Sequence, residues 1–101
     1  MQNPAHRQLL LAERSAHEQE ESAKKRLWHC RNERTRAKMD LDAASANKRR
    51  AALRHYRVTY RRCNEALAAY TQTQIDHDIA IGELDDFEHG RLDMFELGLA
   101  A

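Results

Sequence analysis

The sequence predicts an all-α fold: an antiparallel two-helix coiled-coil hairpin with a short third helix near its C-terminal end. Three observations support this prediction. The 101 residues include one proline and three glycines, and neither residue type occurs between Pro4 and Gly82. Charged residues make up 33% of the chain, a composition typical of long helices. Apolar residues also recur at alternating spacings of three and four, which is the coiled-coil pattern. At this length we expect residues 1–101 to form a single domain.

The first helix is expected over about residues 5–44, with Asn3 and Pro4 as its cap and first turn. One seven-residue line of small and apolar residues runs along it, beside companion positions that are only partly apolar. The line is Leu9, Ala16, Ala23, Cys30, Ala37 and Ala44, and the companions are Glu13, Glu20, Leu27, Arg34 and Leu41.

The second helix is expected over about residues 48–89, and its predicted interface is larger. This interface consists of Leu53, Tyr56, Tyr60, Cys63, Leu67 and Tyr70, continued after Gln74 and His77 by Ile81 and Leu84. Burial there predicts that truncating Leu67 to alanine destabilises the fold by about 2–5 kcal/mol. Truncating Glu20 is expected to change little.

The turn between the helices is predicted at about residues 44–47, the least apolar interval, where Ser45 and Asn47 can cap a new helix. It pairs positions whose residue numbers add up to about 93 or 94, so that small residues face large ones. Cys30 then lies near Cys63. Packed helix axes are too far apart for a typical disulfide, so we expect two reduced thiols. A symmetric dimer of long helices is the alternative to the hairpin.

After Gly90, residues 91–97 form a short amphipathic pattern that predicts the third helix. Leu92 and Phe95 line one side of it. This helix could fold over the open end of the hairpin or dock on another protein, so both residues are candidate partner-binding residues.

Charge is distributed unevenly along the chain. Net charge is +2 over residues 1–42, +7 over residues 43–63 and −8 over residues 64–101. All seven cations of the middle part lie within residues 48–62, the basic segment. Such asymmetry predicts separate surfaces for partners of opposite charge.

Candidate partner-binding residues in the basic segment are Arg54, Arg57, Arg61 and Arg62. Clustered cations bind nucleic acid by releasing counterions from phosphates. However, the interleaved tyrosines occupy interface positions, and no helix-turn-helix, zinc-finger or aromatic RNA-binding motif accompanies them. A solvated basic face near the turn, or a docking patch for an acidic protein surface, is therefore favoured over nucleic-acid binding. Trp28 is either a cover for the core or an interface hot spot.

No motif for catalysis or cofactor binding occurs. The six histidines lack the recurring spacing of a zinc site, and there is no nucleophile elbow, phosphate loop or dinucleotide fingerprint. We expect a non-enzymatic protein without metal or cofactor. The first residues lack an export signal and no apolar run approaches the roughly 20 residues of a membrane span. We therefore expect a cytoplasmic protein without a membrane partner.

Residues 6–14, His-Arg-Gln-Leu-Leu-Leu-Ala-Glu-Arg, followed by Ala16 and a charged helix to Leu41, carry a family resemblance. They resemble the start of the small coiled-coil stalk proteins of type III secretion and flagellar export. The resemblance implies an antiparallel two-helix hairpin that associates with an export ATPase and with substrate chaperones.

Together these features predict a helical protein-interaction module, an adaptor, stalk or chaperone, that recognises a protein partner through charged faces and can form a homodimer. The first alternative is a small inhibitor, from a phage or another mobile element, that blocks a host protein. The second is nucleic-acid binding through residues 48–62. Stoichiometric loss of a partner's activity distinguishes the inhibitor, and steep salt dependence distinguishes nucleic-acid binding.

Overall fold

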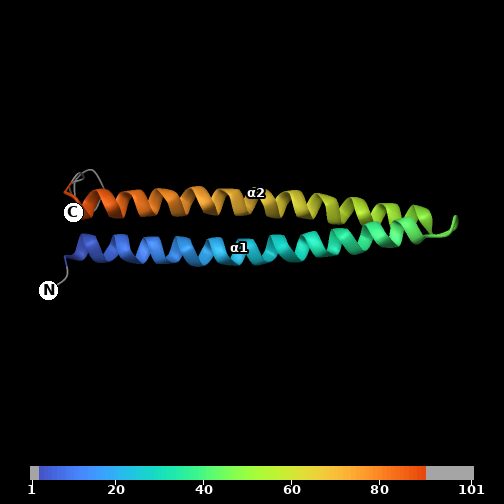
Figure 1. The fold of residues 1–101 in the computed structure, drawn as a ribbon, viewed down its shortest axis with the longest axis horizontal. Helices are drawn as coiled ribbons and strands as arrows, with labels where there is room; N and C mark the ends of the chain where they lie inside the picture. Colours follow the sequence, from blue (N-terminus) through green and yellow to red (C-terminus); the bar gives the residue numbers. More distant parts are fainter. Residues whose placement is uncertain (1–2, 91–101) are drawn as a thin grey trace. The chain divides into compact units, whose positions relative to one another are not determined.

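A computed structural model describes residues 3–90, which form two helices of 40 residues each. These are α1 (Pro4–Ala43) and α2 (Arg49–Glu88) (Figure 1). Within residues 3–90 there is no strand, and the predicted all-α hairpin is confirmed. The predicted third helix at 91–97 lies outside the described residues, as do Leu92 and Phe95. Neither α1 nor α2 contains an apolar stretch that could cross a membrane.

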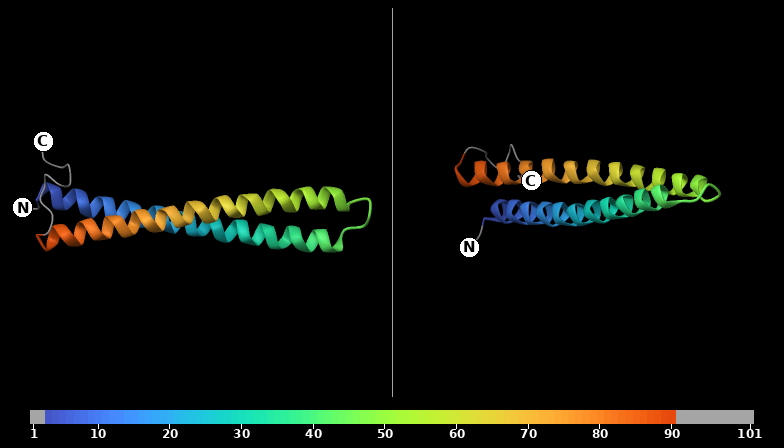
Figure 2. Two further views of the ribbon diagram at one scale, coloured as in Figure 1. Left: turned by 90° about the horizontal axis from the view of Figure 1, so that it is seen from above. Right: turned by 45° about the vertical axis from the view of Figure 1, so that its right-hand side comes forward.

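The chain divides into two units, each built from both helices. The turn unit is Ser22–Thr71, and the terminal unit is Met1–Glu21 together with Gln72–Ala101. Within each unit a segment of α1 lies beside a segment of α2 that runs in the opposite direction (Figures 1 and 2). Each unit therefore supplies the partner that an isolated amphipathic helix needs to bury its apolar face.

Helix α1 begins with the cap that the sequence predicts. The Asn3 side-chain Oδ1 accepts a hydrogen bond of 2.9 Å from the backbone N–H of Ala5. Pro4 takes the first helical position, where its missing N–H leaves no intrahelical bond unmade. These two residues fix where the helix starts.

A short turn over residues 44–48 joins the two helices. The backbone N–H of Lys48 donates to the carbonyl of Ser45 at 3.0 Å, which closes the turn. The Ser45 hydroxyl donates to Asn47 Oδ1 at 2.6 Å, so these two side chains bond to each other. Helix α2 ends at Glu88, and Gly90 follows it with a φ of 69°, a conformation that glycine adopts without steric cost.

The core of the turn unit is narrow and made largely of small side chains. Leu27 packs with Cys63 and Ala66, and the half-buried Cys30 and Tyr70 pack against them. The neighbouring buried residues are Ala37, Leu41 and Thr59. The Thr59 hydroxyl donates to the Tyr56 carbonyl at 2.7 Å, so its burial leaves no donor unsatisfied. Cys30 and Cys63 are free thiols.

Every predicted interface position on α1 is buried or half-buried. On α2 the seven-residue line also lies in the interface, at Tyr56, Cys63, Tyr70, His77 and Leu84. Leu53 is half-buried as well.

The companion line on α2 is where the prediction is wrong. Tyr60, Leu67 and Ile81 were expected in the interface and are exposed. The residues one position earlier take their places, and these are Thr59, Ala66 and Ala80. Both choices flank the same seven-residue line, but small side chains allow closer helix packing. The larger side chains of Tyr60, Leu67 and Ile81 lie at the edge of the helix interface.

Contacts in both units confirm the predicted register. Arg34 lies over the Tyr60 ring in the turn unit, and His17 contacts His77 in the terminal unit. In both pairs the residue numbers add up to 94, the predicted value. The register was therefore predictable, although Tyr60, Leu67 and Ile81 were wrongly placed in the α2 interface.

Truncating Leu27 should destabilise the fold far more than truncating Leu67. Leu27 is 6% exposed and Leu67 is 44% exposed. We expect Leu27→Ala to lower the free energy of unfolding by about 2–5 kcal/mol. Leu67→Ala should lower it by less than about 1 kcal/mol. Urea unfolding followed by circular dichroism measures both, and equal losses would contradict the observed interface.

Enlarging Ala66 should also destabilise the fold, because no space surrounds it. Ala66 is fully buried, whereas Ala68 is exposed two residues later on the same helix. We expect Ala66→Leu to cost about 1–3 kcal/mol through overpacking. Ala68→Leu, the matched control, should stay within about 0.5 kcal/mol of the wild type in the same unfolding measurement.

Candidate functional site

The cations of the basic segment all lie exposed on the turn unit. They are Lys48, Arg49, Arg50, Arg54, Arg57, Arg61 and Arg62. Within the described part of the chain, none of the seven forms an ion pair. This part of the surface therefore carries a concentrated positive charge that is not neutralised by residues 3–90.

Large apolar side chains are also exposed on the turn unit. On α1, Trp28 is 62% exposed and Met39 is 64% exposed. They are 11 residues apart, about three helical turns, and so share one side of the helix. On α2, Tyr60 and Leu67 are seven residues apart and likewise share a side. Trp28 has an edge-on contact with the His29 ring and is not a cover for the core.

Two cation–aromatic contacts connect the helices within the turn unit. The Arg34 guanidinium lies 5.7 Å from the centre of the Tyr60 ring, and the Lys38 ammonium lies 5.8 Å from that of Tyr56. The two tyrosine rings are themselves 6.1 Å apart. Such contacts hold the exposed Tyr60 ring in place at the edge of the interface.

The terminal unit contains a different feature, a polar cluster of Glu13, His17, Glu20 and His77. Glu13 and Glu20 occupy interface positions on α1, and His77 occupies one on α2. His77 Nδ1 lies 2.5 Å from Glu20 Oε2, and His77 Nε2 lies 2.9 Å from Glu13 Oε1, both within hydrogen-bonding distance. The His17 ring lies 5.2 Å from the His77 ring, tilted by 55°.

These contacts favour the positively charged form of His77. Its side chain is only 13% exposed, and each ring nitrogen faces a carboxylate. Hydrogen bonds to Glu13 and then to Glu20 raise the pKa of His77 above its ordinary value. Partial burial opposes this rise, but the two carboxylates outweigh it.

The polar cluster also brings metal-binding atoms together. One ligand atom from each of His17, Glu20 and His77 lies within 4.8 Å of the others. The spacing of the histidines along the chain did not predict this group, because His17 and His77 come from different helices. The sequence did contain a signal for this group. Polar residues occupy interface positions on both helices, and the predicted register places them close together.

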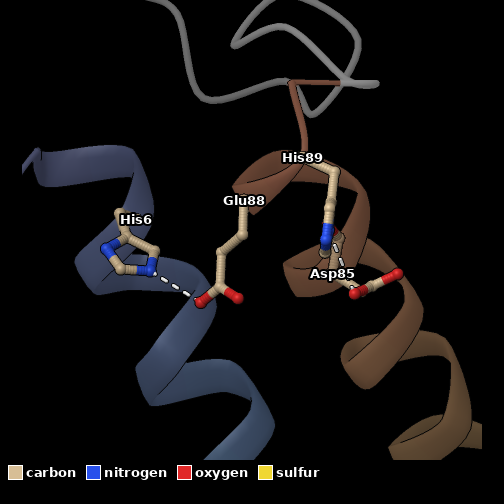
Figure 3. Close-up of polar contacts among 4 residues, drawn as sticks. All are labelled: His6, Asp85, Glu88 and His89. Carbon is tan, nitrogen blue, oxygen red and sulfur yellow. Dashed lines mark hydrogen bonds and ion pairs between the residues drawn. The ribbon is translucent and has the colours of Figure 1, made fainter.

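A second polar contact joins the ends of the two helices in the terminal unit. Figure 3 shows His6 on α1 reaching Glu88 on α2, with Nε2 3.0 Å from Oε1. The His6 ring also stacks on Phe87 with centroids 5.9 Å apart. Asn3, His6, Phe87 and Glu88 line an open depression here, while His89 pairs with Asp85 one turn earlier (Figure 3). Of the described residues that line the depression, Asn3 and Glu88 are exposed and His6 and Phe87 are half-buried.

The charged form of His77 should make the fold depend on pH. Because its pKa is higher in the folded than in the unfolded chain, its contribution to stability is complete below about pH 6.5. That contribution is lost as pH rises through the raised pKa. We expect the free energy of unfolding to fall between about pH 6 and pH 9 more steeply in the wild type than in His77→Gln.

The measurement is urea unfolding across this pH range, with a chelator present so that no metal competes with protons. The groups facing His77 from α1 are Glu13, Glu20 and His17, and its neighbours Asp76 and Asp78 lie exposed on α2. His55→Gln, at an exposed histidine of the turn unit, is the control and should keep the wild-type slope. Identical slopes for wild type and His77→Gln would rule out this role.

Comparison of the chain with protein-family models, with curated proteins and with solved structures found no match.

Proposed function

We propose that the chain is a non-enzymatic helical protein-interaction module that binds a partner protein through the turn unit. One observation carries this proposal. Seven cations that form no ion pair with residues 3–90 lie on the same unit as four exposed large apolar side chains, Trp28, Met39, Tyr60 and Leu67. Aromatic residues, Met and Arg are the residue types enriched in protein interfaces.

The exposed arginines and apolar side chains of the turn unit indicate which kind of partner it binds. An acidic surface would pair with the arginines and speed association by electrostatic attraction. Apolar side chains of the same partner would cover Trp28 and Met39, which share one side of α1, and supply most of the affinity. We therefore propose a protein partner that is both acidic and apolar, encountered in the cytoplasm, where Cys30 and Cys63 stay reduced.

The resemblance of residues 6–41 to export stalk proteins supports the same class of function. It would make the partner an export ATPase or a substrate chaperone. The inhibitor alternative uses the same surface but differs in its consequence, since the bound partner would lose its activity. Nucleic acid competes for the basic segment only, because it leaves the exposed apolar side chains uncovered.

Affinity capture from a host lysate, with and without nuclease, distinguishes these functions. We expect one dominant protein that survives nuclease treatment. Trp28→Ser combined with Met39→Ser should weaken its binding at least about tenfold, because hot-spot side chains contribute about 2 kcal/mol or more. Arg57→Ala combined with Arg61→Ala should slow association and reduce the salt dependence of binding.

Two control variants match these changes in the same chain. Ile75→Ser removes an exposed apolar side chain from the terminal unit, and Lys24→Ala with Lys25→Ala removes two exposed cations from outside the basic segment. Both controls should retain the partner. Binding that disappears with nuclease and follows only the arginines would replace this proposal with nucleic-acid binding.

A further inference from the structure

The polar cluster of the terminal unit has the composition of a metal site. His17 and Glu20 lie three residues apart on α1, so they project from the same side of that helix. His77 reaches them from α2. Two imidazoles and one carboxylate thus converge from two helices, with ligand atoms within 4.8 Å of one another.

The observed spacing needs only a small adjustment to hold an ion. Zinc binds nitrogen and oxygen at about 2.0–2.2 Å with tetrahedral geometry, which places neighbouring ligand atoms roughly 3.4 Å apart. The most distant ligand atoms would move together by about an ångström. The His77–Glu20 pair, now at 2.5 Å, would open by a similar amount. Rotations about side-chain bonds supply such shifts without moving the helices.

We propose that His17, Glu20 and His77 bind a divalent transition-metal ion of the zinc class. Imidazole nitrogen with one carboxylate suits zinc and its neighbours, whereas calcium and magnesium prefer sites made of oxygen ligands. The three protein ligands leave a fourth position for water, which is accessible because His17 is exposed.

Glu13 completes this site without binding the ion. Nδ1 of His77 faces Glu20 and is the nitrogen that binds the metal, while Nε2–H keeps its 2.9 Å hydrogen bond to Glu13. A carboxylate that orients a ligand histidine in this way is the usual outer partner in zinc sites. Metal binding displaces the Nδ1 proton, so the ion replaces the proton between His77 and Glu20.

The bound ion connects α1 to α2 within the terminal unit. Leu9 and Ala5 are the only apolar residues in the described part of this unit that are buried, so the helix pairing there rests on few buried apolar side chains. An ion held by residues 17, 20 and 77 adds a link that the unfolded chain lacks. Zinc should therefore stabilise the folded chain in proportion to its affinity.

Isothermal titration of the full chain, without an affinity tag, tests the site with ZnCl₂ and with MgCl₂ at pH 7.5. We expect one zinc ion per chain, no magnesium binding, and a melting temperature that rises with zinc concentration. His17→Gln and His77→Gln should each weaken zinc binding by at least about 100-fold, and Glu13→Gln by about 10-fold. His55→Gln should bind as the wild type does.

Several results would overturn the proposal: no zinc binding, several weak sites per chain, or equal affinity in His17→Gln and the wild type. His17→Gln is the decisive variant. Its side chain is exposed and lies beside the His77 ring, so we expect its loss to leave the helix interface intact. Circular dichroism checks that each variant remains helical. Failure of this test leaves the protein-interaction proposal unaffected, because the two use different units.

Discussion

Close packing of α1 against α2 depends on a line of small side chains. Thr59 and Ala66 on α2, with Ala37 on α1, are buried where larger residues would hold the helices apart. This requirement decides the placement of the residues beside them. It leaves Tyr60 and Leu67 outside the interface and so produces the apolar surface on which the proposed function depends.

The heptad spacing and the position of the turn were sufficient to predict two antiparallel helices and their register. The companion line on α2 was not predictable by counting apolar residues, because adjacent positions such as Ala66 and Leu67 both flank the interface. The choice between them depends on how closely the helices approach, which is a property of both helices together. The third helix remains a prediction.

The candidate sites were predictable to different extents. The arginines of the basic segment were identified from charge alone, since solvent exposure is the usual state of a charge cluster. The polar cluster was missed because its members are 64 positions apart in sequence, from Glu13 to His77. In the sequence, each of these residues appears as a polar residue that interrupts an apolar pattern. Only the pairing of the helices shows that these polar residues lie together and bond to one another.

The bonding of His77 to both Glu13 and Glu20 also restricts how the two segments of the terminal unit can align. Shifting α2 by one heptad would place Tyr70 or Leu84 between the two glutamates and leave His77 beside only one of them. Buried polar groups without partners are costly, and coiled coils use single polar positions to exclude alternative alignments. Small side chains such as alanine discriminate poorly between alignments a heptad apart. The histidine and its glutamates therefore give this unit a specificity that its few apolar contacts lack.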